Sequence, residues 1–274
     1  LRIGSEIVQR QVDAYRRMRN TFRFLLGNLA GFDDSERLDQ SQLPALERWV
    51  RHRLCELDAQ VRQNADDFRF HEMFTSLYNF CTVDLSAFYF DVRKDSLYCD
   101  DATSVRRHAV RTVLDDLFKA LTAWLAPVLC FTAEEAWLTR FPSEEGSVHL
   151  RQFPAIPSEW RDDHLATVWE SVRRVRRVVT GALEAERQAK RMGSSLQAHP
   201  TVYVSAEDAK ALAAIDLPEI ALTSAATVIA GNPPDGAFQL EEVEGVGVVV
   251  GIAEGIKCER CWQVLPDVGS NSQY

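Results

Sequence analysis

The sequence predicts a mainly α-helical protein, with an antiparallel helical bundle followed by a small α+β domain. In the first half of the chain, apolar residues recur at spacings of three and four, which places them on one face of a helix. After residue 200 the pattern changes to short runs rich in Val, Ile and Thr, separated by Gly and Pro, which is typical of strands. We therefore expect a helical domain over residues 1–160, an α+β domain over 161–255, and a cysteine-containing tail over 256–274.

Four long amphipathic helices are expected in the first domain. The apolar face of the first one includes Val8, Val12, Tyr15, Met18 and Phe22. The four helices cover approximately residues 7–29, 44–63, 69–90 and 103–127. The motif TAEE at 132–135 has the form of a capping box and predicts one more short helix. Long helices joined by short loops pack as an antiparallel bundle.

The second domain should begin after a surface linker, residues 141–161, which is rich in Pro and Trp. A long helix is expected to follow and to end at Gly193. Gly245 and Gly247 are expected to mark a hairpin turn. The predicted elements are a helix at 163–191, strands at 201–205, 226–229, 238–243 and 246–252, and a short helix at 206–214.

The composition is that of a soluble globular protein, with 46% hydrophobic and 26% charged residues. No segment reaches the ~18 uninterrupted apolar residues that a membrane span needs, and the charged first residues do not form a signal peptide. Because the chain starts at Leu1 rather than Met, we expect it to be a piece of a longer protein. Reduced thiols of a cytoplasmic protein are expected at the four cysteines on or beside apolar helical runs, which are Cys55, Cys81, Cys99 and Cys130.

The net charge of −9 argues against a nucleic-acid partner unless the acidity is localised. Residues 200–274 contain 11 acidic and 3 basic residues, so most of the negative charge lies there. The preceding part is almost neutral, and its basic residues are mainly arginines, whose planar guanidinium suits phosphate and base edges. RNA binding is therefore compatible with the total charge where arginines cluster.

One such cluster lies on the first helix. At about 100° per residue, Arg16, Arg19, Asn20 and Arg23 occupy one continuous arc beside the apolar face. Guanidinium groups suit phosphate and bidentate base contacts, and the Asn amide suits a base edge. The alternative is a solvated helix face that pairs with acidic side chains of a neighbouring helix.

A second cluster lies on the long helix of the second domain, where Arg173, Arg176 and Arg177 share one side. These side chains could follow a phosphate backbone. The alternative is again a helix paired with nearby Asp and Glu side chains.

Cys258 and Cys261 have the spacing of half a tetrahedral zinc site. A complete ribbon needs a second cysteine pair some 15–20 residues later, and no cysteine follows before Tyr274. The local context, a strand end followed by a turn, favours a zinc knuckle over a redox-active pair. There is no Gly-rich phosphate loop and no nucleophile elbow, and acidic pairs such as 115–116 are expected at helix ends or on polar faces. We therefore expect no catalysis by this chain.

Several segments, in order along almost the whole chain, resemble the part of bacterial-type isoleucyl-tRNA synthetases that follows the catalytic domain. They are AYRRMRNTFRFLLGNL at 14–29, LERWV at 46–50, DLSAFYFD at 84–91, KDSLY at 94–98, APVLCFTAEEAW at 126–137, RMGSSL at 191–196 and CERCW at 258–262. The segment at 126–137 is similar in the isoleucine, valine and leucine enzymes. The last two segments resemble the isoleucine enzyme in particular.

The resemblance implies the helical anticodon-binding domain of a class I synthetase, its junction domain, and the first half of its C-terminal zinc module. Such an enzyme uses ATP to ligate isoleucine to its tRNA in the cytoplasm. ATP and Mg²⁺ would be bound only by the catalytic domain, and this chain would bind the anticodon stem-loop of the isoleucine tRNA. The other implied partners are the catalytic and editing domains of the same chain, in a monomer without membrane association.

The resemblance also implies roles for individual residues. Zinc would be held by Cys258 and Cys261, although the missing second pair departs from the family pattern. Together, the arginine clusters and the resemblance predict tRNA contacts at Arg16, Arg19, Asn20, Arg23, Arg173, Arg176, Arg177, Arg260 and Trp262.

Two other interpretations stay open. The chain could be the same region of a sister enzyme for valine, leucine or methionine, although the valine enzyme typically ends in a coiled coil and no heptad run follows residue 193. It could also be a free-standing helical adaptor or zinc protein without a role in RNA binding.

Overall fold

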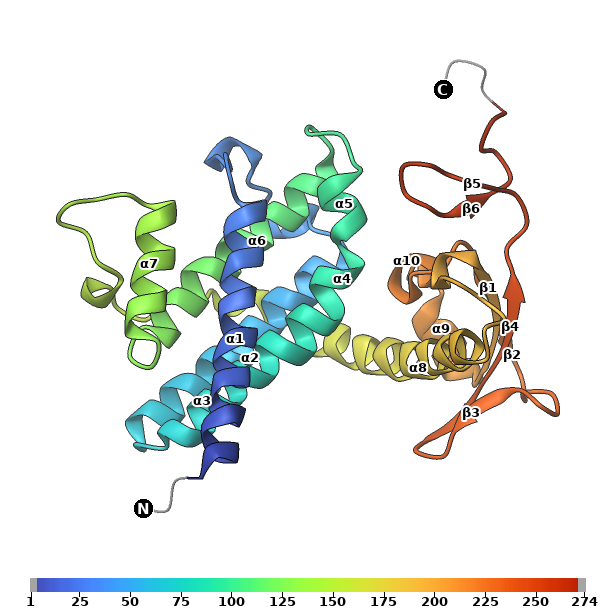
Figure 1. Ribbon diagram of the computed structural model, residues 1–274, viewed down its shortest axis with the longest axis horizontal. Coiled ribbons are helices and arrows are strands. Elements are labelled where there is room, and N and C mark those ends of the chain that lie inside the picture. Colours follow the sequence, from blue (N-terminus) through green and yellow to red (C-terminus); the bar gives the residue numbers. More distant parts are fainter. Residues whose placement is uncertain (1–3, 271–274) are drawn as a thin grey trace. The chain divides into compact units, whose positions relative to one another are not determined.

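The structure, a computed structural model, describes residues 4–270. The chain forms two compact units, Leu1–Asp163 and His164–Tyr274. The first unit is helical and the second combines helices with a small sheet (Figure 1), which confirms the predicted fold class. No helix within 4–270 is both long and apolar enough to span a bilayer.

The first unit is built around α6 (Val105–Leu125), which is buried on almost every side from Ala109 onward. A helix that is buried all round must have helices on several sides, and α6 contacts α1, α2, α5 and α7. In Figure 1 it passes behind α1. The other helices are α1 (Ser5–Asn28), α2 (Ala45–Asp66), α3 (Phe70–Asn79), the π-helix Phe80–Tyr89, α4 (Phe90–Val92), α5 (Lys94–Tyr98) and α7 (Cys130–Arg140). Single 3-10 turns lie at Asp34–Glu36, Gln40–Gln42, Val148–Leu150 and Ser158–Trp160.

The first turns of α1 differ from the prediction. Met18 and Phe22 are buried as expected, but Val8, Val12 and Tyr15 are 50%, 49% and 40% exposed. Among the described residues, the main neighbours of α1 are the π-helix, α6 and α7, and the buried residues of α1 begin at Met18. The expectation of one continuous buried face is therefore wrong for this part of α1.

The predicted capping box does not begin α7, because Thr132 lies inside the helix. The hydroxyl of Thr132 is instead 3.0 Å from the hydroxyl of Tyr15. A carboxylate oxygen of Glu134 accepts a hydrogen bond from the backbone N–H of Val148 at 2.8 Å. Val148 itself is buried, so the predicted surface linker is anchored to α7.

Another correction concerns the acidic pair in α6. Asp115 is 1% exposed, and it accepts hydrogen bonds from Arg37 and, at 2.5 Å, from Arg140. Asp116 pairs with Arg51 at 2.7 Å and with Arg37 at 2.9 Å. Both carboxylates therefore lie in a buried ionic cluster and not on a polar face or at a helix end. Their arginine partners compensate the cost of burying the charges.

The second unit contains a four-stranded sheet in the order β2-β1-β4-β3. β1 pairs in parallel with β2, while β4 is antiparallel to both β1 and β3. The helices α8, α9 and α10 gather on one side of this sheet (Figure 1), and burial alternates along β1 as expected for a sheet covered on one face. A separate hairpin joins β5 to β6. The bounds are α8 (Asp163–Gln188), a 3-10 turn Ser195–Gln197, β1 (Ala198–Val204), α9 (Ala206–Leu212), α10 (Leu217–Ala221), β2 (Thr227–Ala230), β3 (Phe238–Leu240), β4 (Val243–Ile252), β5 (Ile256–Lys257) and β6 (Val264–Leu265).

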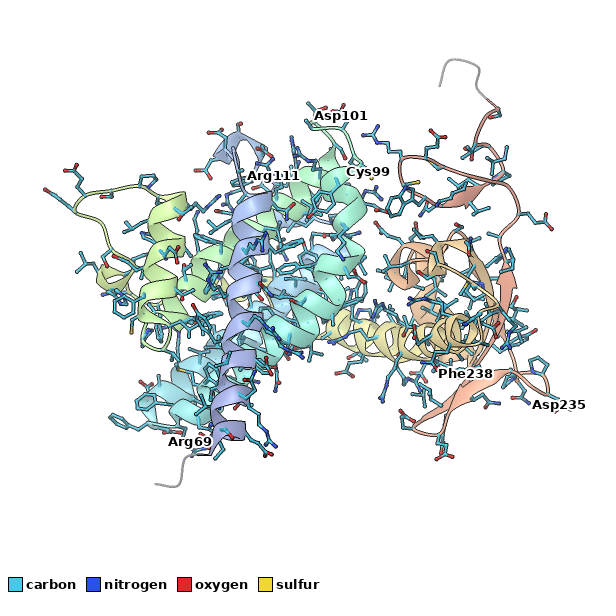
Figure 2. All side chains as sticks on the ribbon, viewed as in Figure 1. Arg69, Cys99, Asp101, Arg111, Asp235 and Phe238 are labelled. Atoms are coloured by element: carbon cyan, nitrogen blue, oxygen red, sulfur yellow. The ribbon has the colours of Figure 1, made fainter. Side chains whose placement is uncertain are left out.

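The long helix α8 ends earlier than predicted. Its last residue is Gln188, and Lys190, with φ of 57°, adopts the left-handed conformation that was expected of Gly193. Further back in α8, Gly181 permits close packing of Phe238 from β3, since a Cβ at this glycine would lie 3.1 Å from the ring. Figure 2 labels Phe238 on this strand.

The two glycines that were expected in a hairpin turn lie inside β4. The turn that joins β3 to β4 falls between Leu240 and Val243. Gly245 has φ of +73°, and a Cβ at Gly247 would lie 2.3 Å from Pro233. The glycines therefore permit an irregular strand and a close contact rather than the turn itself.

Candidate nucleic-acid interface

The predicted arginine arc of α1 is exposed along one side of the helix. Arg16, Arg19, Asn20 and Arg23 are all exposed, because the residues between them, among them Met18 and Phe22, turn toward the core. The structure therefore brings these four side chains together on one helical surface.

The arginines of this arc differ from most other arginines of the first unit in their pairing. Arg16 donates to Asp13 at 3.0 Å, in a pair whose side chains are 70% and 44% exposed. Arg19 and Arg23 form no ion pair or hydrogen bond with any described side chain or carbonyl. By contrast, Arg51 and Arg93 are buried and bound to carboxylates. Two uncompensated guanidinium groups on one surface attract an anionic partner.

A cavity of about 280 Å³ lies beside this arc, between α1 and α7. From α1 it is lined by Arg19, Phe22, Arg23 and Leu26, and from α7 by Thr132, Glu135, Ala136 and Thr139. The contact between the hydroxyl groups of Tyr15 and Thr132 links α1 to α7. The cavity thus combines an apolar floor with two cations and one carboxylate.

Two residues near this cavity were missed by sequence reasoning. The motif at 132–135 predicts a capping role for Glu135, but its exposed side chain forms no ion pair with the residues of the described range. Phe131 is 92% exposed, which makes it the most exposed of the large hydrophobic residues in 4–270. The signal for Phe131 was its position in α7, since it falls outside the buried face marked by Ala133 and Ala136.

The second arginine cluster makes contacts within its own unit. Arg176 Nε donates to the carbonyl of Ile220, at the end of α10, at 2.8 Å. Arg177 pairs with Glu242 at 2.6 Å, and both side chains are exposed. Arg173 lies on the same helix and is half-buried. The arginines of this cluster are therefore partly engaged in contacts within the unit and partly exposed to solvent.

Cys258 and Cys261 lie together in the loop between β5 and β6. The Trp262 N–H donates to the carbonyl of Cys258 at 3.0 Å, which closes the turn. Backbone N–H groups of Cys261 and Arg260 donate to the Cys258 sulfur, and they lower the pKa of this thiol. A turn that stabilises a thiolate fits a zinc ligand. Within the described range, however, no group of three or more His, Cys, Asp or Glu side chains could hold a metal, so the fit is to half a zinc site.

Trp262 was predicted to support RNA binding from the same loop. Its side chain is 61% exposed, and its φ of 66° is unusual for a residue other than glycine. Lys257 Nζ lies 5.4 Å from the centre of its ring. Arg260 is exposed in the same loop. The loop therefore presents an aromatic ring and a cation to the solvent.

Comparison with known proteins shows the family. Residues 47–202 match the model of the anticodon-binding domain of tRNA ligases. The chain is 51% identical over 274 residues to an isoleucine–tRNA ligase of Agrobacterium fabrum, of which it covers 28%. It is 54% identical over 273 residues to that of Ruegeria pomeroyi and 51% identical over 275 residues to that of Caulobacter vibrioides, with all or nearly all of this chain covered. The chain spans 28% of the length of these relatives, and the resemblance inferred from the sequence is confirmed. The chain therefore belongs to the anticodon-binding domain family of tRNA ligases.

Proposed function

We propose that this chain binds the anticodon stem-loop of the isoleucine tRNA, as the non-catalytic part of a cytoplasmic, monomeric, ATP-dependent isoleucine–tRNA ligase. The observation that carries the proposal is the presence of two unpaired arginines of α1, Arg19 and Arg23, beside the cavity, on a domain of the anticodon-binding family. The names of the similar proteins, which are isoleucine–tRNA ligases, supply the choice of tRNA.

In this proposal, Arg19 and Arg23 bind phosphate or base edges, and Asn20 can read a base edge with its amide. Arg16 can join them at little cost, because its pair with Asp13 is exposed and such pairs contribute only ~0–1 kcal/mol. Since phosphate contacts release counterions, the affinity should fall steeply with salt.

The second unit would supply further contacts through the exposed faces of Arg173, Arg177, Arg260 and Trp262. Arg176 already donates to a carbonyl, but a guanidinium has five N–H donors, so the remaining ones can still reach a phosphate. These contacts are secondary in the proposal, because Arg176 and Arg177 also interact with groups of the second unit itself.

Cys258 and Cys261 would provide two of the four ligands of a structural zinc ion in the longer ligase. Zinc, when bound, supplies folding free energy to such a small module. The protein's own contribution is the turn whose N–H groups favour the Cys258 thiolate. ATP and Mg²⁺ would act only in the catalytic part of the ligase.

A binding assay with matched arginine variants tests the proposal. Arg19→Ala and Arg23→Ala should each weaken binding of the isoleucine tRNA by ~1–3 kcal/mol, as expected for a lost base or phosphate contact. Arg17→Ala is the control, because Arg17 is an exposed arginine of the same helix that lies well outside the arc at about 100° per residue. It removes the same charge and should change the affinity by less than ~0.5 kcal/mol.

The valine tRNA serves as the competing ligand, and isoleucine-dependent ATP–pyrophosphate exchange by the chain alone should stay at background. Equal losses of affinity for Arg17→Ala and Arg19→Ala would show that the arginines act only through general charge attraction. Equal affinity for the two tRNAs would contradict the assignment to isoleucine.

A further inference from the structure

We infer that the cavity between α1 and α7 holds one unstacked RNA base, with Phe131 as the stacking surface and Glu135 as the acceptor that selects guanine. The inference rests on the proposed function and identifies base-reading residues within that site. It starts from an apolar cavity lined by unpaired charges of both signs, and from the exposed Phe131, which does not line the cavity but directly precedes Thr132, one of the lining residues.

The size and lining of the cavity suit one flat, partly polar group. At about 280 Å³, it is at the lower limit of ligand pockets, which are typically ~300–1,000 Å³. Phe22 and Ala136, both at most 4% exposed, form the floor together with Leu26. An apolar floor of this kind can cover the face of a base but offers nothing to a phosphate.

The polar groups at the rim are charged and available. Arg19 and Arg23 come from α1 and Glu135 from α7, and all three line the same cavity. They form no ion pair with one another or with other described residues, although opposite charges are present. A ligand between them that offers both donors and acceptors would satisfy both sides.

Phe131 supplies the stacking surface. It precedes Glu135 by four residues on α7, so the two side chains lie on the same side of the helix, one turn apart. Its ring is 92% exposed and has no ring contact within 4–270. Single-stranded RNA is commonly bound by stacking its bases on aromatic side chains of this kind.

The combination of groups favours guanine among the four bases. The Watson–Crick edge of guanine carries N1–H and N2–H₂ side by side, which both oxygens of one carboxylate can accept. Its O6 and N7 are the acceptors to which Arg binds in a bidentate manner. Adenine and cytosine offer an amino group to Glu135 but lack this pair of adjacent donors, and uracil would place carbonyl oxygens against the carboxylate. A peptide ligand is less suitable, because an acidic one would face Glu135 and a basic one would face the two arginines.

The test measures binding of the chain to fluorescent 17-nucleotide anticodon hairpins, in which each anticodon position carries guanine, inosine, adenine, cytosine or uracil in turn. Inosine differs from guanine only by the missing N2 amine. We expect one position at which replacement of guanine by inosine weakens binding about tenfold, a typical loss for one base contact. In Glu135→Gln this difference should disappear, whereas the exposed control Glu72→Gln should retain it.

Phe131→Ala should weaken binding of all hairpins by a similar factor, and Phe131→Trp should restore it. The exposed aromatic control Tyr98→Ala, which is 61% exposed in the wild-type chain, should have no effect. Wild-type binding without any base preference, or a guanine preference that survives in Glu135→Gln, would overturn the inference while leaving the proposed function intact. If the wild-type chain binds no hairpin at all, both fail.

Discussion

Replacement of Arg93 by methionine should destabilise the helical unit by about 3–5 kcal/mol, the range for removing one partner of a buried ion pair. Arg93 Nε and Nη2 donate to the two carboxylate oxygens of Glu47 at 2.7 and 2.8 Å. Arg93 is 3% exposed and Glu47 is fully buried. Methionine preserves much of the side-chain volume, so the main loss is the compensation of a buried carboxylate.

Tyr89 can compensate only part of this loss. Its hydroxyl donates to Glu47 at 3.2 Å. Burial, and then the charge of Glu47, raise the pKa of Tyr89 well above its usual value, so the hydroxyl stays protonated and remains a donor. One neutral hydrogen bond contributes ~0.5–1.5 kcal/mol, which is less than the cost of an unpaired buried charge.

Urea unfolding followed by circular dichroism at 222 nm gives the free energy of unfolding. The double variant Glu47→Gln/Arg93→Met should recover a large part of the loss, because it removes the unpaired charge. Lys94→Met is the matched control, since Lys94 forms an exposed pair with Asp91 and should cost less than ~1 kcal/mol. A loss below ~1 kcal/mol for Arg93→Met, or additive losses in the double variant, would refute the reasoning.

Two further predictions concern the second unit. In the zinc-free chain at neutral pH, iodoacetamide should alkylate Cys258 well before Cys81, as measured by mass spectrometry. The lowered pKa of Cys258 increases its thiolate fraction, whereas burial raises the pKa of Cys81 to about 12 and keeps it protonated; equal rates would contradict this. Glu242→Gln should strengthen tRNA binding, because it frees Arg177 and removes a nearby negative charge, and Arg177→Ala should weaken binding less than Arg19→Ala. If neither variant changes the affinity, Arg177 has only a structural role.

The helices of the first unit could be predicted from the sequence because their signal is local. The spacing of apolar residues along α2 and α6 reports which face is buried, whatever lies opposite. The same signal was misleading in the first turns of α1, where Val8 and Val12 have the correct spacing but remain about half exposed. Burial depends on a second surface, and the periodicity of one helix contains no information about it.

Glycine and capping motifs were less reliable for a related reason. Thr132 and Glu135 have the spacing of a capping box, but α7 begins two residues earlier, at Cys130. The sequence pattern predicts a turn at Gly247, whereas in the structure this glycine leaves room for Pro233 beside β4. A glycine shows that space or an unusual backbone is needed, and only the tertiary structure shows which of the two applies.

The candidate site shows most directly what the sequence could not supply. Arg19 on α1 and Arg177 on α8 belong to clusters that look equivalent in the sequence, yet one has no described partner and the other lies 2.6 Å from Glu242. The difference arises from a carboxylate 65 residues away along the chain. The Arg177–Glu242 pair is exposed and costs at most ~1 kcal/mol to break, so it lowers the gain from a phosphate at Arg177 only modestly, but no such cost applies at Arg19. Pairing in the folded chain, which the number of arginines in a segment does not reveal, therefore makes α1 the first surface to test for RNA binding in the proposed function.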